Sequence, residues 1–312
     1  MSDTSTRTHH RVCHLCEAMC GLVIRTEGDK VTDIRGDKDD PLSRGHVCPK
    51  AVALQDIHED PDRLRKPMKR IRKAPGEYQH VEIEWSEALD LAANALASTI
   101  EKRGVDAIGA YFGNPSVHNY GMLTHQRNLF RHIRTRNRFS ATSVDQLPHH
   151  LVSLWCFGHM LLHPIPDVDR THYFLMLGAN PLASNGSIWT VPDVRQRLKD
   201  LKSRGGKLVV VDPRRTETAE LASEHLFIRP GTDAAFLLAM IHVLFRDDLV
   251  APGPLAAFTD GLDEVAGAVS GLSPDWAAAL TGIAAGDIER IAHELAQAEA
   301  GICYGRMGVS TQ

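Results

Sequence analysis

The chain has 312 residues, of which 43% are hydrophobic and 24% charged, and its formal net charge at pH 7 is −4. This length suffices for two or three domains with cores of their own. The slight negative charge excludes a broadly basic surface for nucleic acid or anionic membranes, and no apolar run approaches the roughly 18 residues of a membrane span. The N-terminus has no apolar signal region, so we expect a cytoplasmic protein without membrane insertion.

Four cysteines dominate the N-terminal part of the chain. Cys13, Cys16, Cys20 and Cys48 are spaced C-x2-C-x3-C-x27-C. Three thiolates on one tight loop, with a fourth brought back by the chain, are typical of a [4Fe–4S] cluster. A four-cysteine zinc site is the alternative, but zinc sites usually pair their ligands in two short hooks, which favours iron–sulfur here. Pro49 would end regular structure beside the fourth ligand.

Residues 10–66 are predicted to form a compact, strand-rich cluster domain. Two short alternating runs, 21–26 and 30–35, flank a Glu-Gly-Asp turn. Further on, a helix is expected from Ser86 to Ile100, followed by a buried strand over 105–113. Arginine and lysine gather in 62–73 and 127–139; we interpret both runs as solvated faces or docks for an acidic partner or anionic cofactor.

Between residues 171 and 230, apolar strands alternate with helices of about a dozen residues. This pattern predicts a doubly wound parallel sheet in an α/β domain over 141–300. Ligands of such sheets bind at the carboxyl ends of the strands. Small and polar residues occur at four strand ends, and no G-x-G-x-x-G fingerprint of an NAD site is present. The candidate cofactor-binding residues there are Gly113, Asn114, Gly178, Asn180, Asp212, Gly231 and Asp233.

Taken together, these motifs resemble the molybdopterin oxidoreductases of the dimethyl sulfoxide reductase type, which include formate dehydrogenases and nitrate reductases. The resemblance rests on the cysteine spacing and on segments that span most of the chain. These are GDKDDPLSRGHVCPK (36–50), PDRLRKPMKR (61–70), WSEAL (85–89), LGANPLASNGS (177–187) and 209–245.

The resemblance implies a [4Fe–4S] cluster beside a bis(molybdopterin guanine dinucleotide) cofactor that carries molybdenum or tungsten. Lys50 matches the family's basic residue between cluster and pterin, and Gly178, Asn180, Asp212 and Asp233 match its nucleotide-contacting loops. Family members are longer, with a discontinuous second domain. The resemblance therefore assigns 67–140 to the first half of that domain and 301–312 to a truncated return strand. As a truncated piece, the chain is expected to be inactive by itself.

The protein ligand to the metal is the least certain of these assignments. Counting from Asp145 as in formate dehydrogenases and nitrate reductases places the ligand at Leu151, which cannot coordinate a metal. Cys156 matches only with a gap, and is a ligand or a core residue. His149 and His150 flank the same position and serve either in proton transfer and substrate contact or in the structure. For His159 and His163 a structural role is favoured.

The leading functional hypothesis is a catalytic subunit of the formate dehydrogenase type. It would carry out a two-electron reaction on a small molecule and pass electrons through the cluster to a partner protein. One alternative is a non-redox hydratase in which the metal acts as a Lewis acid. Another is an electron-transfer subunit like the large iron–sulfur subunit of complex I; Asn180, Asp212 and Asp233 argue against this last reading.

Overall fold

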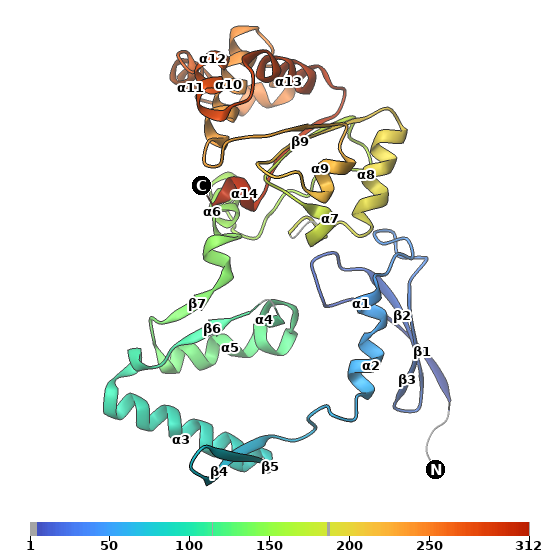
Figure 1. Cartoon of the computed structure of the whole chain (residues 1–312), viewed down its shortest axis with the longest axis vertical. Helices are drawn as coiled ribbons and strands as arrows, with labels where there is room; N and C mark the ends of the chain where they lie inside the picture. The colour runs from blue at the N-terminus through green and yellow to red at the C-terminus, as the bar shows by residue number, and fades with distance from the viewer. Residues whose placement is uncertain (1–4, 114, 186–187, 312) are drawn as a thin grey trace. The chain divides into compact units, whose positions relative to one another are not determined.

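The computed structural model describes residues 5–113, 115–185 and 188–311. The chain divides into two compact units, one of residues 1–15 and 20–141 and the other of residues 16–19 and 142–312. Figure 1 shows a strand-rich N-terminal part and, separately, a parallel sheet with helices on both faces. The predicted mixed α/β class is thereby confirmed. Within the described residues, no helix is both long and apolar enough to cross a membrane.

The first unit begins with a three-stranded antiparallel sheet. Its strands are β1 (Thr6–Val12), β2 (Gly21–Glu27) and β3 (Lys30–Gly36), in that order. The predicted runs at 21–26 and 30–35 are β2 and β3, and the Gly28 turn joins them with φ +57°. A left-handed turn of this kind suits glycine, which has no Cβ to clash. Two short helices follow, α1 (Pro49–Val52) and α2 (Leu54–Glu59).

The rest of the first unit contains a charged hairpin, two longer helices and a small parallel sheet. The expected helix is α3 (Trp85–Arg103), and the strand expected over 105–113 is shorter: a 3-10 turn, η1 (Val105–Ala107), precedes β6. Strand β6 pairs in parallel with β7. Helix α3 buries none of its side chains; Trp85 is 64% exposed. The other elements are β4 (Met68–Ala74), β5 (Glu77–Glu82), β6 (Ala110–Phe112), α4 (Pro115–His118), α5 (Tyr120–Ile133) and β7 (Arg138–Ser140).

The second unit is built on a four-stranded parallel sheet in the order β10-β9-β8-β11. The strands are β8 (Tyr173–Leu177), β9 (Lys207–Val211), β10 (Glu224–Leu226) and β11 (Gly301–Gly305). The helices are α6 (Leu147–Phe157), α7 (Pro181–Ser184), α8 (Val194–Ser203), α9 (Glu217–Leu221), α10 (Asp233–Arg246), α11 (Leu262–Val269), α12 (Pro274–Thr281), α13 (Ala285–Gln297) and α14 (Met307–Ser310), with 3-10 turns η2 (Ala141–Val144) and η3 (Gly253–Phe258).

Both faces of β8 and β9 are buried, which explains why these strands are continuously apolar. Leu175 and Val209 pack on one face, against α10, α12 and α13. Phe174 and Val210 pack on the other face, against α8 and α9. Helices therefore cover both sides of the sheet, as the alternating pattern predicted.

The C-terminal strand differs from its prediction. Residues 301–312 were expected to return to the preceding α/β segment, but β11 pairs in parallel with β8 along its whole length, from Gly301↔Tyr173 to Gly305↔Leu177. That assignment is wrong, because the free edge of β8 offers a hydrogen-bonding partner in the same unit. The strand is also shorter than expected, and the turn α14 follows it.

Candidate functional site

The first three cysteines lie on the loop that closes the β1–β2 hairpin. Strands β1 and β2 pair up to Val12↔Gly21, and the Cys13 N–H donates to the Cys20 carbonyl at 2.8 Å. Cys13 and Cys20 are buried, whereas Cys16 is half-buried. A hairpin thus fixes the two ends of a short loop that carries three thiols, as a cluster site requires.

The return loop that leads to Cys48 is tied to the residue directly after Cys20. The Gly21 N–H donates to Ser43 Oγ at 3.0 Å, and the Asp37 N–H donates to the Gly21 carbonyl at 2.9 Å. Ser43 also donates to Asp40, and these hydrogen bonds lower the pKa of the Asp40 carboxyl. The loop is therefore held at the cysteine hairpin by specific bonds.

Cys48 and Lys50 lie at the N-terminal end of helix α1. Cys48 is half-buried at the N-cap of α1, where Pro49 begins the helix, and Lys50 is exposed in its first turn. Within the described chain, no three His, Cys, Asp or Glu side chains gather closely enough to hold a single metal ion. A cubane cluster instead binds each thiolate to a different iron, and the donor set of four cysteines suits it chemically. The four ligands stay a prediction.

The second candidate site is a cavity of about 600 Å³ at the carboxyl ends of the parallel strands. The strand order reverses between β8 and β11, because β9 and β10 extend the sheet on one side of β8 and β11 on the other. Ligands of open α/β sheets bind at such a switch point. The cavity is lined by Asp145, Gly178, Ala179, Asn180, Ala183, Ser184, Asp212, Pro213, Arg214, Thr216, Pro230, Asp233, Arg306, Met307 and Gly308.

Two glycines let the ends of β8 and β11 meet at this cavity. Gly178 has φ +56°, and a Cβ built on it would lie 2.7 Å from the Gly308 Cα. The Gly308 N–H also donates to the Gly178 carbonyl at 3.0 Å. Neither position has room for a side chain, so the cavity floor here is bare backbone. Backbone of this kind can approach a phosphate closely.

Two buried carboxylates, Asp212 and Asp233, face the cavity from neighbouring loops. Asp212 is 9% exposed and Asp233 4% exposed. The Arg214 N–H donates to Asp212 Oδ1 at 2.8 Å. Burial, and after it the charge of Asp212, raises the pKa of the Asp233 carboxyl. Carboxylates in these positions can accept hydrogen bonds from the N–H groups of a base or the hydroxyls of a ribose.

Asn180 lines the cavity, but both ends of its side-chain amide are used within the fold. Its Nδ2 donates to Glu217 Oε2 at 2.8 Å, and its Oδ1 accepts from Thr218 Oγ1 at 2.7 Å. These bonds fasten the turn after β8 to helix α9. Asn180 therefore shapes the wall of the cavity through its position.

Three of the predicted cofactor-binding residues are not among those that line this cavity. Gly231, with φ +81°, belongs to the turn before α10 and does not line the cavity. Gly113 lies in the first unit, and Asn114 lies outside the described residues. The structure therefore brings together four of the seven, namely Gly178, Asn180, Asp212 and Asp233.

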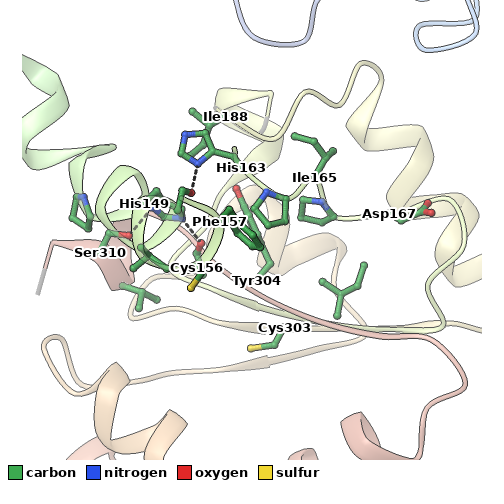
Figure 2. A pocket seen from close by; sticks show the side chains of 18 of the residues that line it. His149, Cys156, Phe157, His163, Ile165, Asp167, Ile188, Cys303, Tyr304 and Ser310 are labelled. Atoms are coloured by element: carbon green, nitrogen blue, oxygen red, sulfur yellow. Dashed lines mark hydrogen bonds between the residues drawn. The ribbon is translucent and has the colours of Figure 1, made fainter. Parts of the chain in front are cut away.

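A larger cavity of about 960 Å³ lies between α6 and β11 (Figure 2). Its wall is mainly apolar, but it includes His149, Cys156, His163 and Cys303. Cys156 is exposed in the last turn of α6 and does not line the switch-point cavity.

His149 is locked by two hydrogen bonds at the corner between β11 and α14 (Figure 2). Its Nε2 lies 3.0 Å from the Gly305 carbonyl, and its Nδ1 lies 3.0 Å from Ser310 Oγ. A carbonyl can only accept, so Nε2 carries the proton and Nδ1 accepts from Ser310. Burial lowers the pKa of His149, which keeps the ring neutral.

His150 and His163 form a second pair of neutral imidazoles. Their ring centroids are 5.1 Å apart, and His163 Nδ1 lies 2.9 Å from Ser153 Oγ. Burial lowers the pKa of both rings, with the neighbouring histidine as the next cause. Within the described chain, His150 Nδ1 and His163 Nε2 are buried and have no hydrogen-bond partner.

The sequence reading overlooked the residues that β11 contributes to the switch-point cavity: Arg306, Met307 and Gly308. A usable signal existed, since an apolar run followed by GRMG has the pattern of a strand end with small residues. It was missed because the strand had been assigned to another sheet.

Comparisons with known proteins agree with this geometry. The family model "Molybdopterin oxidoreductase" matches residues 63–269, and "Molybdopterin oxidoreductase Fe4S4 domain" matches residues 6–59. The second match contains all four cysteines, and the first contains the strand ends after β8 and β9.

Individual relatives cover the chain almost completely, while the chain spans only about two fifths of their length. The chain is 29% identical to "Formate dehydrogenase H" of Escherichia coli over 96% of its residues and 41% of that protein. It is 28% identical to "Probable oxidoreductase YoaE" of Bacillus subtilis over 90% of its residues and 40% of that protein. Among solved structures, acetylene hydratase from Pelobacter acetylenicus matches with a TM-score of 0.72 and 25% identity, over 96% of this chain and 40% of that one.

The family model that matches residues 63–269 covers well over half of the chain. Together with the iron–sulfur model, it shows that the chain belongs to the molybdopterin oxidoreductases.

Proposed function

We propose that this chain is the cluster-bearing and dinucleotide-binding part of a molybdenum or tungsten enzyme. The enzyme would oxidise or reduce a small molecule such as formate or nitrate in a two-electron step. The observation that carries the proposal is the switch-point cavity with its two buried carboxylates, Asp212 and Asp233, in a chain that also carries the four-cysteine motif.

The proposed cofactor is the bis(molybdopterin guanine dinucleotide) form. When bound, it supplies a metal that exchanges two electrons with the substrate. Asp233 would accept from the N1–H and exocyclic amine of guanine. Asp212, fixed by the Arg214 N–H, would accept from ribose hydroxyls, and the bare backbone at Gly178 and Gly308 would lie against the phosphates.

Electron transfer would use the cysteine hairpin. Cys13, Cys16, Cys20 and Cys48 would hold the [4Fe–4S] cluster, from which electrons leave singly to a partner protein. Lys50 lies exposed in the first turn of α1, two residues after Cys48. Its cation would lie between the two anionic centres and favour the transfer. We propose a cytoplasmic location for this protein.

We expect His150, rather than His149, to transfer protons near the metal. Both ring nitrogens of His149 are engaged, and its tautomer is fixed by the Gly305 carbonyl. His150 Nδ1 is buried without a partner in the described chain. Cys156 lines the larger, apolar cavity, a location that does not favour the role of metal ligand.

Anaerobic purification of the full-length protein, followed by metal and nucleotide analysis, tests the proposal. We expect molybdenum or tungsten, about four irons per chain, and GMP released by mild hydrolysis. Asp233→Asn, which removes the charge and replaces one of the two acceptor oxygens by an N–H donor with little change in shape, should lower the GMP content and leave the iron content unchanged. One equivalent of zinc without iron would contradict the cluster, and iron alone would favour the electron-transfer subunit.

A second candidate is a non-redox hydratase. The observation in its favour is the structural similarity to acetylene hydratase, which extends over nearly the whole chain. Here the metal would act as a Lewis acid toward water or substrate. A loaded enzyme that hydrates acetylene and reduces no dye with formate would decide for this alternative.

A further inference from the structure

The two basic runs of the chain differ in how their charges are balanced. In the first run, over 62–73, Lys66 Nζ lies 2.8 Å from Glu84 Oε1 and Lys69 Nζ lies 3.0 Å from Glu87 Oε1. Both carboxylates lie at the start of helix α3. Exposed ion pairs of this kind add little stability, but they cancel charge locally. The first run is therefore a solvated face whose charge is partly balanced.

The second run lies in a segment that contains no carboxylate. Residues 107–144 hold five arginines and neither aspartate nor glutamate. Since this segment contributes +5 to a chain total of −4, the other 274 residues together carry −9. Asp106, directly before the segment, lies 2.7 Å from Arg136 Nη2 and balances one of the five. In the described part of the chain, no carboxylate forms an ion pair with the other four, which are Arg127, Arg131, Arg134 and Arg138.

Helix α5 and strand β7 carry these four arginines, which we call the arginine face. Arg127 and Arg131 lie one helical turn apart, side by side on α5. Arg134 is the left-handed C-cap of the helix, and the Arg138 guanidinium carbon lies 5.8 Å from the centre of the Phe130 ring. All four arginines are exposed. The helix dipole favours a cation in the last turn, as at Arg131, but gains nothing from Arg127 in the middle of the helix. Helix stability therefore does not explain the cluster.

The chemistry of this segment favours a protein as its partner. Large aromatic side chains are exposed beside the arginines: Tyr120, at the start of α5, is 82% exposed, and Phe139, in β7, is 56% exposed. Arginine and aromatic residues are the types enriched in protein–protein interfaces. A long polyanion such as nucleic acid would extend past the segment and meet the net negative charge of the rest of the chain. A compact acidic surface needs to contact only the segment itself.

We propose that the arginine face docks a small electron-carrier protein with an acidic surface. This rests on the proposed function, which needs a carrier to receive electrons, and adds the surface that binds it. Complementary charges speed association and fix the orientation of the two proteins, and salt weakens both effects. Guanidinium groups pair with carboxylates through two parallel hydrogen bonds, so we expect aspartate and glutamate side chains to be the carrier's contacts.

The experiment measures the binding of an acidic plant-type [2Fe–2S] ferredoxin to the full-length protein by calorimetry at low salt, without turnover. Arg127→Glu combined with Arg131→Glu should weaken binding about tenfold or more, because each substitution replaces an attraction by a repulsion. Arg72→Glu combined with Lys73→Glu is the matched control. It makes the same change of charge at exposed positions of the first basic run, and should change the affinity less than about threefold.

Salt dependence and a milder variant give independent checks. Raising the salt from about 20 mM to about 200 mM should weaken ferredoxin binding to the unaltered protein about tenfold, and to the α5 double variant much less. Arg127→Gln combined with Arg131→Gln keeps good helix formers and decides the question if the charge reversal disturbs folding. It should weaken binding about threefold or more.

Four results would contradict the proposal. Equal losses in the α5 and the control variants would overturn it, as would an affinity of the unaltered protein that does not depend on salt. A short duplex DNA that binds as tightly as ferredoxin, and loses affinity in the same α5 variant, would assign the face to nucleic acid instead. If the unaltered protein contains molybdenum or tungsten together with iron but binds no ferredoxin, this inference fails and the proposed function stands. A protein that contains none of these metals refutes the proposed function itself, and the carrier with it.

Discussion

At the scale of single residues, burial determines which charges and protons are available. Asp233 is almost completely buried and has a raised pKa, whereas Lys50 is exposed on α1. A buried carboxylate gains from donors that a ligand brings, since its own surroundings solvate it poorly. An exposed lysine gains little from the fold and can be replaced with little effect on stability.

Lys50→Ala should therefore separate turnover from folding. Because the side chain is exposed, we expect the variant to retain iron and pterin at wild-type levels. Dye reduction should fall at least tenfold, because in the proposed function Lys50 supplies the cation between the two anionic centres. Lys50→Arg keeps the charge and should restore a large part of the rate. Unchanged turnover at full cofactor loading would make Lys50 an ordinary surface residue.

At the scale of elements, helix α6 and the segment after it carry three buried or half-buried histidines, of which His149 bonds to strand β11. Burial lowers the pKa of His149, His150 and His163 from the ordinary value of 6.5. Below about pH 6.5 the unfolded chain binds protons at these positions that the folded chain does not. Their contribution to stability is thus complete above that pH and declines as the pH falls.

Unfolding measured at a series of acidic pH values tests this predicted loss of stability. The free energy of unfolding of the 312-residue chain should fall as the pH is lowered below about 6.5. His150→Gln, which cannot gain a proton, should make this decline shallower. His80→Gln is the control, because His80 is exposed on β5. An equally steep decline in both variants would show that other groups cause the acid sensitivity.

The meeting of β8 and β11 depends on a pair of glycines, which gives a second prediction at this scale. Gly178→Ala would place a Cβ 2.7 Å from the Gly308 Cα at φ +56°. We expect a loss of stability of about 2–4 kcal/mol, from strain and displaced backbone. Gly205→Ala, at φ +84° with nothing within 4 Å, should cost only the conformational part, about 1 kcal/mol. Urea unfolding measures both, and equal losses would contradict the close packing.

The same elements show how far sequence reasoning reaches. Strands β8 and β9 were predictable because both faces are buried, which leaves a continuous apolar run. Strand β11 was assigned to the wrong sheet because its partner lies more than a hundred residues away and a short run of four or five residues carries no pairing information. The ion pair of Arg306 with Asp145 was missed for the same reason. The glycines and carboxylates at the strand ends were predicted correctly as turn residues, because they occur in short sequence motifs that are typical of turns.

At the scale of the whole molecule, large apolar side chains remain exposed in the first unit. Helix α3 buries none of its residues, and Trp85 and Leu89 are 64% and 62% exposed. Apolar faces of this kind promote association. The 312-residue chain produced alone should therefore self-associate at micromolar concentration in light scattering. Trp85→Ser combined with Leu89→Ser should shift it toward the monomer, and a monodisperse wild-type monomer would contradict the expectation.

The meeting of β8 and β11 also has a consequence for the order of events during synthesis. The cysteine hairpin and its return loop are complete once the first 50 or so residues have left the ribosome. The switch-point cavity needs Gly178 and Gly308, which are separated by about 130 residues. At ordinary elongation rates this gap lasts on the order of ten seconds. Under the proposed function, the nascent chain would receive its iron–sulfur cluster well before it could hold a nucleotide, so the topology of the sheet would separate the two loading steps in time.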